Sequence, residues 1–186
     1  MGRKLGIAFS ILAALVAVFC VVVALQPADF RIERSASIDA PPENVFALVN
    51  NFRHWDRWSP WARRDPEMTA AYEGPEAGAG AVYAWAGNNE VGEGRMTITE
   101  SIPHARIEIQ LDFFRPFAAT NTAVFTFAES GGATSVTWSM EGRNNFLAKA
   151  FNLLMDMDAM VGGDFEKGLA AMKSAAETSN TGESAP

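Results

Sequence analysis

The sequence has little of what disulfide bonds, metal centres and nucleic-acid surfaces need. Its only cysteine is Cys20, which excludes an intramolecular disulfide and a cysteine-based zinc site. Its two histidines, His54 and His104, lie far apart with no cysteine near them. The 15 basic residues are outnumbered by 22 acidic ones, and the net charge of −7 repels a phosphate backbone. We therefore expect no metal, no cofactor and no nucleic-acid partner.

Catalytic patterns are also missing. The sequence contains no nucleophile elbow, no phosphate-binding loop and no metal-ligand spacing. The candidates for acid–base chemistry form no recognisable pair: His54, Glu93, Glu141 and Asp156. The sequence therefore favours a binding function over catalysis, and leaves an enzymatic function as the alternative.

What the sequence does have is one long apolar run near its N-terminus. Residues 5–25 carry no charge, and as a helix they would span about 31 Å, which matches the hydrocarbon core of a bilayer. Gln26 and Pro27 end the run. The alternative is a cleaved signal peptide, but its apolar region is normally shorter and ends at a small-residue cleavage site. We predict an uncleaved membrane anchor over residues 1–28.

The charges around this anchor predict its orientation. Arg3, Lys4 and the terminal amine precede the apolar run, whereas Arg31 and Arg34 follow it. Positive charge is enriched on the cytoplasmic side of membrane segments, and a basic N-terminus before the first span is the pattern of a signal anchor. We expect a single-pass protein with its N-terminus in the cytoplasm and its domain outside, in the periplasm.

The rest of the chain has the length and the apolar content of one packed domain, with 48% hydrophobic and 20% charged residues overall. We place this domain at residues 29–177 and a disordered, Ser- and Thr-rich tail at residues 178–186. Apolar and polar residues alternate in a first strand at 30–38 and again in about six strands between Met68 and Met140. Two short helices separate the first strand from the others.

A long C-terminal helix is expected after the last strand, because apolar residues recur at three- and four-residue steps from Phe146 to Met172. Gly162-Gly163 is expected to kink it. A sheet with one apolar face must bury that face, and this helix is its natural cover. The predicted fold is therefore α+β, with a curved antiparallel sheet wrapped around a long C-terminal helix, preceded by one transmembrane helix.

Several short motifs occur in a characteristic order along this domain. They are APPENVF at 40–46, WDRWSPW at 55–61, GAGAVYAW at 78–85, GEG at 92–94, GATSVTW at 132–138 and Gly168-Leu169. With these motifs the chain resembles the START/polyketide-cyclase-like (SRPBCC) superfamily, which has the helix-grip fold. The resemblance implies a hollow between helix and sheet. Members bind lipids, sterols, hormones or polyketides, some are enzymes, and some are cochaperones.

The candidate site consists of bulky side chains at positions expected to face that hollow. They are Tyr83, Trp85, Met96, Phe113, Phe125, Trp138 and Met140 on the strands, and Phe151, Leu154 and Met155 on the last helix. Aromatic and methionine walls suit a lipophilic small molecule. They are also ordinary core material, so a filled core is the competing interpretation.

Three tryptophans form a second candidate group. Trp55, Trp58 and Trp61 are interpreted as a gate to the cavity, as a contact with the membrane interface near the anchor, or as a structural plug that fixes the short helices. Altogether the sequence predicts an anchored, non-catalytic binder of a lipophilic small molecule. A polyketide cyclase/dehydratase-like enzyme and a non-binding interaction module are the alternatives, and nothing in the sequence identifies a protein partner.

Overall fold

The computed structural model describes the backbone of residues 2–183 and the side-chain surroundings of residues 4–178. The described chain divides into two compact units. One unit contains residues 1–30 and 143–157. The other contains residues 31–142 and 158–186, and it includes most of the sheet.

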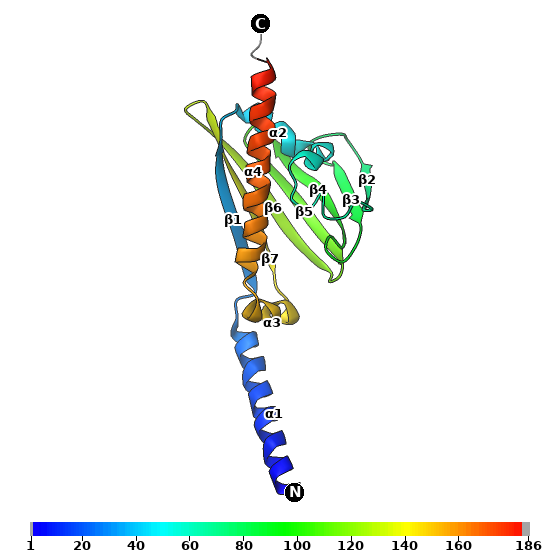
Figure 1. Ribbon diagram of the computed structural model, residues 1–186, viewed down its shortest axis with the longest axis vertical. Coiled ribbons are helices and arrows are strands. Elements are labelled where there is room, and N and C mark those ends of the chain that lie inside the picture. The colour runs from blue at the N-terminus through cyan, green and yellow to red at the C-terminus, as the bar shows by residue number, and fades with distance from the viewer. Residues whose placement is uncertain (1, 184–186) are drawn as a thin grey trace. The chain divides into compact units, whose positions relative to one another are not determined.

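The elements follow one another in the order expected (Figure 1). They are α1 (Gly2–Leu25), β1 (Asp29–Ile38), α2 (Pro42–Asn50), the 3-10 helix η1 (Phe52–Arg57), β2 (Thr69–Glu73), β3 (Val82–Ala86), β4 (Glu93–Ile102), β5 (Arg106–Arg115), β6 (Ala119–Ser130), β7 (Ala133–Arg143), α3 (Phe146–Leu154) and α4 (Met157–Glu183). Pro42 suits the first turn of α2, where the missing proline N–H loses no hydrogen bond.

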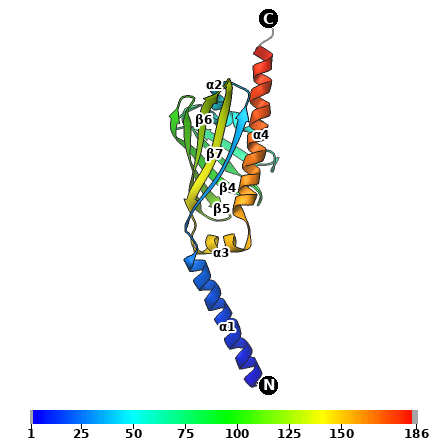
Figure 2. The ribbon, with the colours of Figure 1, turned by 90° about the vertical axis from the view of Figure 1, so that its left-hand side faces the viewer.

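In the described residues the strands form one seven-stranded sheet, in the order β1-β7-β6-β5-β4-β3-β2. Each neighbouring pair from β2 to β7 is antiparallel. The sheet is therefore a meander from β2 to β7, and β1 is added next to β7 as the edge strand. The α+β helix-grip fold predicted from the sequence is confirmed, with α4 crossing the sheet face on which α2 and η1 also lie (Figures 1 and 2).

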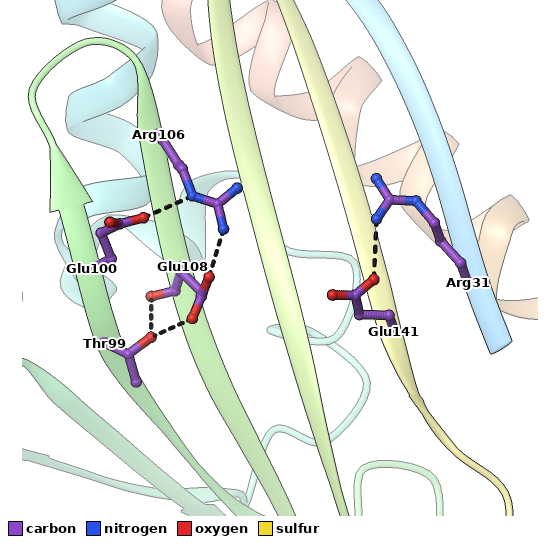
Figure 3. Close-up of polar contacts among 6 residues, drawn as sticks. All are labelled: Arg31, Thr99, Glu100, Arg106, Glu108 and Glu141. Atoms are coloured by element: carbon purple, nitrogen blue, oxygen red, sulfur yellow. Dashed lines mark hydrogen bonds and ion pairs between the residues drawn. The ribbon is translucent and has the colours of Figure 1, made fainter. Parts of the chain in front are cut away.

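The outer face of the sheet is polar. Arg106 bonds Glu100 and Glu108 on β4 and β5, and Arg31 of β1 bonds Glu141 of β7 (Figure 3). These groups are partly or largely solvent-exposed, so each pair contributes little to stability. Their side chains identify the outer positions of the strands, and period-two alternation then assigns the apolar residues between them to the inner face.

The segment expected to form one long C-terminal helix is two helices. α3 ends at Leu154, and Met155 has an extended backbone conformation, with φ −133° and ψ 133°. The expected kink at Gly162-Gly163 does not interrupt the helix, because α4 runs through both glycines. A Cβ on Gly162 would collide with the guanidinium of Arg34, so this glycine admits a close side-chain approach.

The chain has a helix at each end, α1 and α4. α1 is long and apolar enough to span a membrane, and a signal sequence passes the same test. Most of its side chains are exposed, although Val23 near its C-terminal end is fully buried. At the other end α4 continues to Glu183, so it includes most of the segment expected to be disordered. Residues 184–186 of that predicted tail lie outside the described residues.

Candidate functional site

One half of the inner sheet face is filled by stacked aromatic rings, which we call the core cluster: Trp55, Trp58, Trp61, Phe125, Trp138 and Phe165. The ring of Trp138 lies between two others, with its centroid 4.9 Å from that of Phe125 and 3.9 Å from that of Phe165. Phe165 comes from α4, so this stack joins the helix to β6 and β7. Phe125 and Trp138, both predicted to line a cavity, are 0% and 3% exposed here.

The three tryptophans after α2 take part in the same cluster. Trp55 and Trp58 are buried, and their indole N–H groups donate to the backbone carbonyls of Val49 and Leu48 at the end of α2. Trp61 is half-buried and meets Trp138 and Phe165 edge-on. Buried indoles with satisfied N–H groups fix α2 and η1 against the sheet, which supports the interpretation of Trp55 and Trp58 as a plug.

Other inner-face residues are half-buried, and we call them the open patch: Tyr83, Trp85, Met96, Leu111, Phe113, Asn121 and Met140. The strand register brings them together. Tyr83 is opposite Met96, Met96 is opposite Leu111, and Leu111 is opposite Asn121. Five of these residues were predicted for the cavity. The open patch is thus an apolar surface that crosses five strands and stays partly accessible to solvent.

The aromatic residues of the open patch form a row of their own. The rings of Tyr83 and Trp85 stack with centroids 5.9 Å apart, and Phe113 meets Trp85 edge-on at 5.9 Å. The Trp85 indole lies against Gly94 on β4, where any Cβ would collide with it. The pairing of β4 with β5 shifts register beside Gly94, as expected for a glycine bulge. The absence of a side chain at Gly94 therefore lets the Trp85 ring lie against β4.

The polar groups of the open patch are neutral. Burial raises the pKa of Tyr83 to about 12, with a smaller contribution from Tyr72, so its hydroxyl is protonated at neutral pH. Asn121 donates weakly to the sulfur of Met140 at 3.9 Å. The Trp85 indole donates to the carbonyl of Val91. The patch therefore offers one hydroxyl and one amide beside apolar side chains.

One buried polar atom lacks a partner in the described part of the chain. It is the indole nitrogen of Trp138 in the core cluster. An unpaired buried donor costs about 1–3 kcal/mol of stability. The rings against Trp138 are those of Trp58, Trp61, Phe125 and Phe165.

Two small cavities lie elsewhere. One, of about 50 Å³, is lined by residues of η1, β2 and β3, including Arg53 and Tyr72. The other, of about 210 Å³, belongs to the unit that contains α1 and α3. Neither is lined by a residue predicted for the ligand cavity, and both are below the roughly 300 Å³ at which pockets for drug-sized molecules begin.

The three residues of the predicted C-terminal helix that were expected to line the cavity lie in the unit that contains α1 and α3. Phe151 and Leu154 belong to α3 and Met155 follows it, and all three are exposed. The prediction assumed one continuous helix over the sheet, whereas the chain breaks after Leu154. Phe165 takes the contact with the sheet that the prediction had given to this segment.

Sequence reasoning missed Leu111 and Asn121 of the open patch. Strict alternation in β5 and β6 carried the signal for both, since Leu111 lies between Ile109 and Phe113 on one face. Asn121 was not predicted as a site residue, because a single polar residue on an apolar face gives no sequence pattern.

No cluster of three or more metal-ligating side chains occurs among the described residues.

The sequence of this chain matches a known protein family, and its fold matches solved structures. Residues 29–177 match the family described as polyketide cyclase / dehydrase and lipid transport. No curated protein matches the chain. Among solved structures, a protein from Chromobacterium violaceum is 15% identical with a TM-score of 0.57, covering 82% of this chain and 99% of its own.

Two further structures share the fold. The Aha1 dimer from Colwellia psychrerythraea is 16% identical with a TM-score of 0.58, covering 80% of this chain and 96% of its own. The di-domain ARO/CYC BexL, from the BE-7585A biosynthetic pathway, is 19% identical with a TM-score of 0.58, covering 83% of this chain and 52% of its own. Identities this low show the fold alone. Because the family match covers most of the chain, the protein belongs to the polyketide cyclase / dehydrase and lipid transport family.

Proposed function

We propose that the protein binds a neutral lipophilic small molecule on the open patch, without catalysing a reaction, while α1 holds it to a membrane. The observation that carries the proposal is the half-burial of Trp85, Met96 and Phe113 on a sheet face whose other half is fully packed. Exposed apolar surface gathered on a concave face is typical of a binding site. The family supports a ligand-binding fold.

The charge of the open patch selects the ligand class. None of the seven residues of the open patch is a lysine, an arginine, a histidine, an aspartate or a glutamate. A bound carboxylate or phosphate would therefore lose its hydration without gaining a cation. A ligand with an apolar body and a hydroxyl or carbonyl fits better, since Tyr83 and Asn121 can bond such a group.

The same composition argues against acid–base chemistry at this site. General acid–base catalysis needs a titratable group whose pKa lies near the working pH. Tyr83 is the titratable residue of the open patch, and a pKa of about 12 keeps it protonated. A hydroxyl in that state donates or accepts a hydrogen bond, which is a binding role.

The expected affinity is moderate. A ligand that buries about 300 Å² of apolar surface gains roughly 7–8 kcal/mol by transfer from water. Lost translational and side-chain freedom offsets several kcal/mol of that gain. The balance corresponds to binding in the micromolar range or weaker, which suits a carrier that must also release its ligand.

Two adjacent phenylalanines provide a matched test. Phe113 lies in the open patch, whereas Phe114 is 52% exposed, lies outside that patch and is unpaired at the register shift between β4 and β5. Native mass spectrometry of the full chain released from nanodiscs should detect a long-chain alcohol bound to the wild type. Phe113→Asp should abolish the adduct and Phe114→Asp should keep it. Equal adducts in both variants, or none in the wild type, would refute the proposed site.

The anchoring part of the proposal has its own test. α1 is uncharged from Leu5 to Leu25 and most of its side chains are exposed, which is what a lipid-facing helix requires. Basic residues before α1 favour a domain outside the cytoplasm, in the periplasm. Intact mass and membrane fractionation should give a full-length, membrane-bound chain. A soluble product that begins near Gln26 would mean that the segment is a signal peptide.

A further inference from the structure

α3 is an amphipathic helix that presents its apolar side outward. Four of its large apolar residues are more than half exposed: Phe146 at 52%, Leu147 at 62%, Phe151 at 53% and Leu154 at 76%. No residue of α3 is buried. In a water-soluble domain the apolar stripe of a surface helix faces the core. α3 is turned the opposite way, which calls for an apolar partner.

The polar residues of α3 lie on the side away from Leu154. Lys149 and Asn152, with Leu153 between their side and the apolar one, border the cavity of about 210 Å³ together with Gln26 and Asp29, which follow α1, and Asn152 remains exposed to solvent. The side chain of Asn145 caps the helix by accepting the N–H of Ala148. Within this unit the cavity is bordered by Lys149, Asn152 and Leu153, whereas Phe146, Leu147, Phe151 and Leu154 are left exposed.

α3 is also held at the end of α1. The two helices are in contact and belong to the same compact unit. The N–H of Asn144, just before α3, donates to the carbonyl of Ala28, just after α1. α3 lies across the C-terminal end of α1 rather than along it (Figures 1 and 2). A helix that lies across the end of a membrane-spanning helix runs along the membrane surface.

We infer that α3 is an interfacial helix, which inserts its apolar side into the lipid leaflet at the point where α1 leaves the bilayer. This inference rests on the proposed membrane anchoring by α1. Interfacial helices bury their apolar side about 5–10 Å into the boundary between headgroups and acyl chains. Phe146, Leu147 and Leu154 would occupy that boundary, and Lys149 would lie on the aqueous side.

The alternative partner, a second copy of this chain, fits less well. α3 has nine residues and is about 13 Å long. One side of so short a helix presents far less than the roughly 800 Å² that each partner buries in a stable interface. Lys149 is the only charged residue of α3, so insertion of apolar side chains has to supply the attraction. We therefore expect little dependence on anionic lipid or on salt.

Single labelled cysteines test the inference in the full chain. Cys20→Ser removes the only native thiol, and a fluorophore is then attached at Leu154→Cys, at Asn152→Cys or at Leu15→Cys. Asn152 lies about 160° around the helix from Leu154 and is the matched control. Leu15 lies in the middle of α1 and reports on anchoring alone. In liposomes, the readouts are quenching by nitroxide lipids and quenching by aqueous iodide.

The expected result is strong quenching at Leu154 by a nitroxide near the top of the acyl chain, with protection from iodide. The label at Asn152 should respond to iodide, and the label at Leu15 should respond to a nitroxide deep in the chain. If the label at position 15 is quenched by the deep nitroxide but the label at position 154 is quenched by iodide, α1 spans the membrane and α3 is not interfacial. If Leu154 is protected from both quenchers and its label shows energy transfer between copies, the partner is a second chain. If Leu15 itself is not deep, the anchoring proposal fails, and this inference fails with it.

Discussion

The core cluster and the open patch occupy the same face of one sheet and are built from similar residues, but they differ in what covers them. Trp138 has the ring of Trp58, which follows η1, and the ring of Phe165 on α4 against it, and it is 3% exposed. Trp85 has Tyr83 and Phe113 beside it on the sheet and is only half-buried. Burial by a second layer makes an aromatic residue part of the core. Without that layer, the same residue type is available to a ligand.

This difference separates stability from function in the molecule. The packed half holds α4, α2 and η1 on the sheet, so changes there should act on folding. The open half contributes less burial, so changes there should act on binding with a smaller effect on folding. Each prediction below tests one side of that division.

The largest expected effect comes from emptying the core cluster. Trp138→Ala removes the ring between Phe125 and Phe165, and truncation of a buried aromatic lowers the free energy of unfolding by about 3–5 kcal/mol. Thr126→Ala is the control, because Thr126 is exposed beside buried Phe125, and it should cost less than about 0.5 kcal/mol. Chemical denaturation measures both. Equal, small losses would mean that the inner and outer faces are wrongly assigned.

Truncation in the open patch should cost less stability. Phe113 is half-buried, so Phe113→Ala should lower the free energy of unfolding by about 1 kcal/mol, roughly half the effect of exposing a fully buried phenylalanine. The same denaturation experiment serves here. A loss as large as that of Trp138→Ala would place Phe113 in the core and remove the distinction between the two regions.

The faces of the sheet were predictable, because they follow from local alternation. Arg106, Glu108 and Gln110 alternate with Ile107, Ile109 and Leu111, and β5 has this orientation in the structure. Which inner residues stay half-buried was not predictable. Trp85 and Trp138 both follow an alternating pattern, and their different exposure depends on where α2, η1 and α4 pack, which is a tertiary property.

The break between α3 and α4 was hidden for a similar reason. Phe146, Ala150 and Leu153 continue the apolar spacing that leads to Phe165, and neither glycine nor proline stands at Met155-Asp156. The spacing shows that each helix has an apolar side. It does not show that the apolar side of α3 is exposed whereas Phe165 of α4 is buried.

The ionisation of Tyr83 gives a smaller, pH-dependent effect. Its pKa is raised from 10.0 to about 12, chiefly by burial, so its contribution to stability is complete below pH 10 and is lost as pH rises toward 12. The chain has two tyrosines, so Tyr72→Phe leaves Tyr83 as the only one. Its ultraviolet titration should then have a midpoint near pH 12. A midpoint near 10 would mean that Tyr83 is fully hydrated.

The central claim, that the open patch binds a lipophilic molecule, is tested most directly by the fluorescence of Trp85. Residues 5–25 contain no tryptophan, and Trp55, Trp58 and Trp138 are buried in the core cluster. The fifth tryptophan, Trp61, is half-buried but meets Trp138 and Phe165 in the core cluster, away from the open patch. A brominated long-chain alcohol added to the full chain in nanodiscs should therefore quench mainly Trp85, and Trp85→Phe should remove that quenching while keeping an aromatic ring. The matching unbrominated alcohol should quench neither protein. Quenching that is equal in the wild type and in Trp85→Phe, or absent from both, would contradict the account.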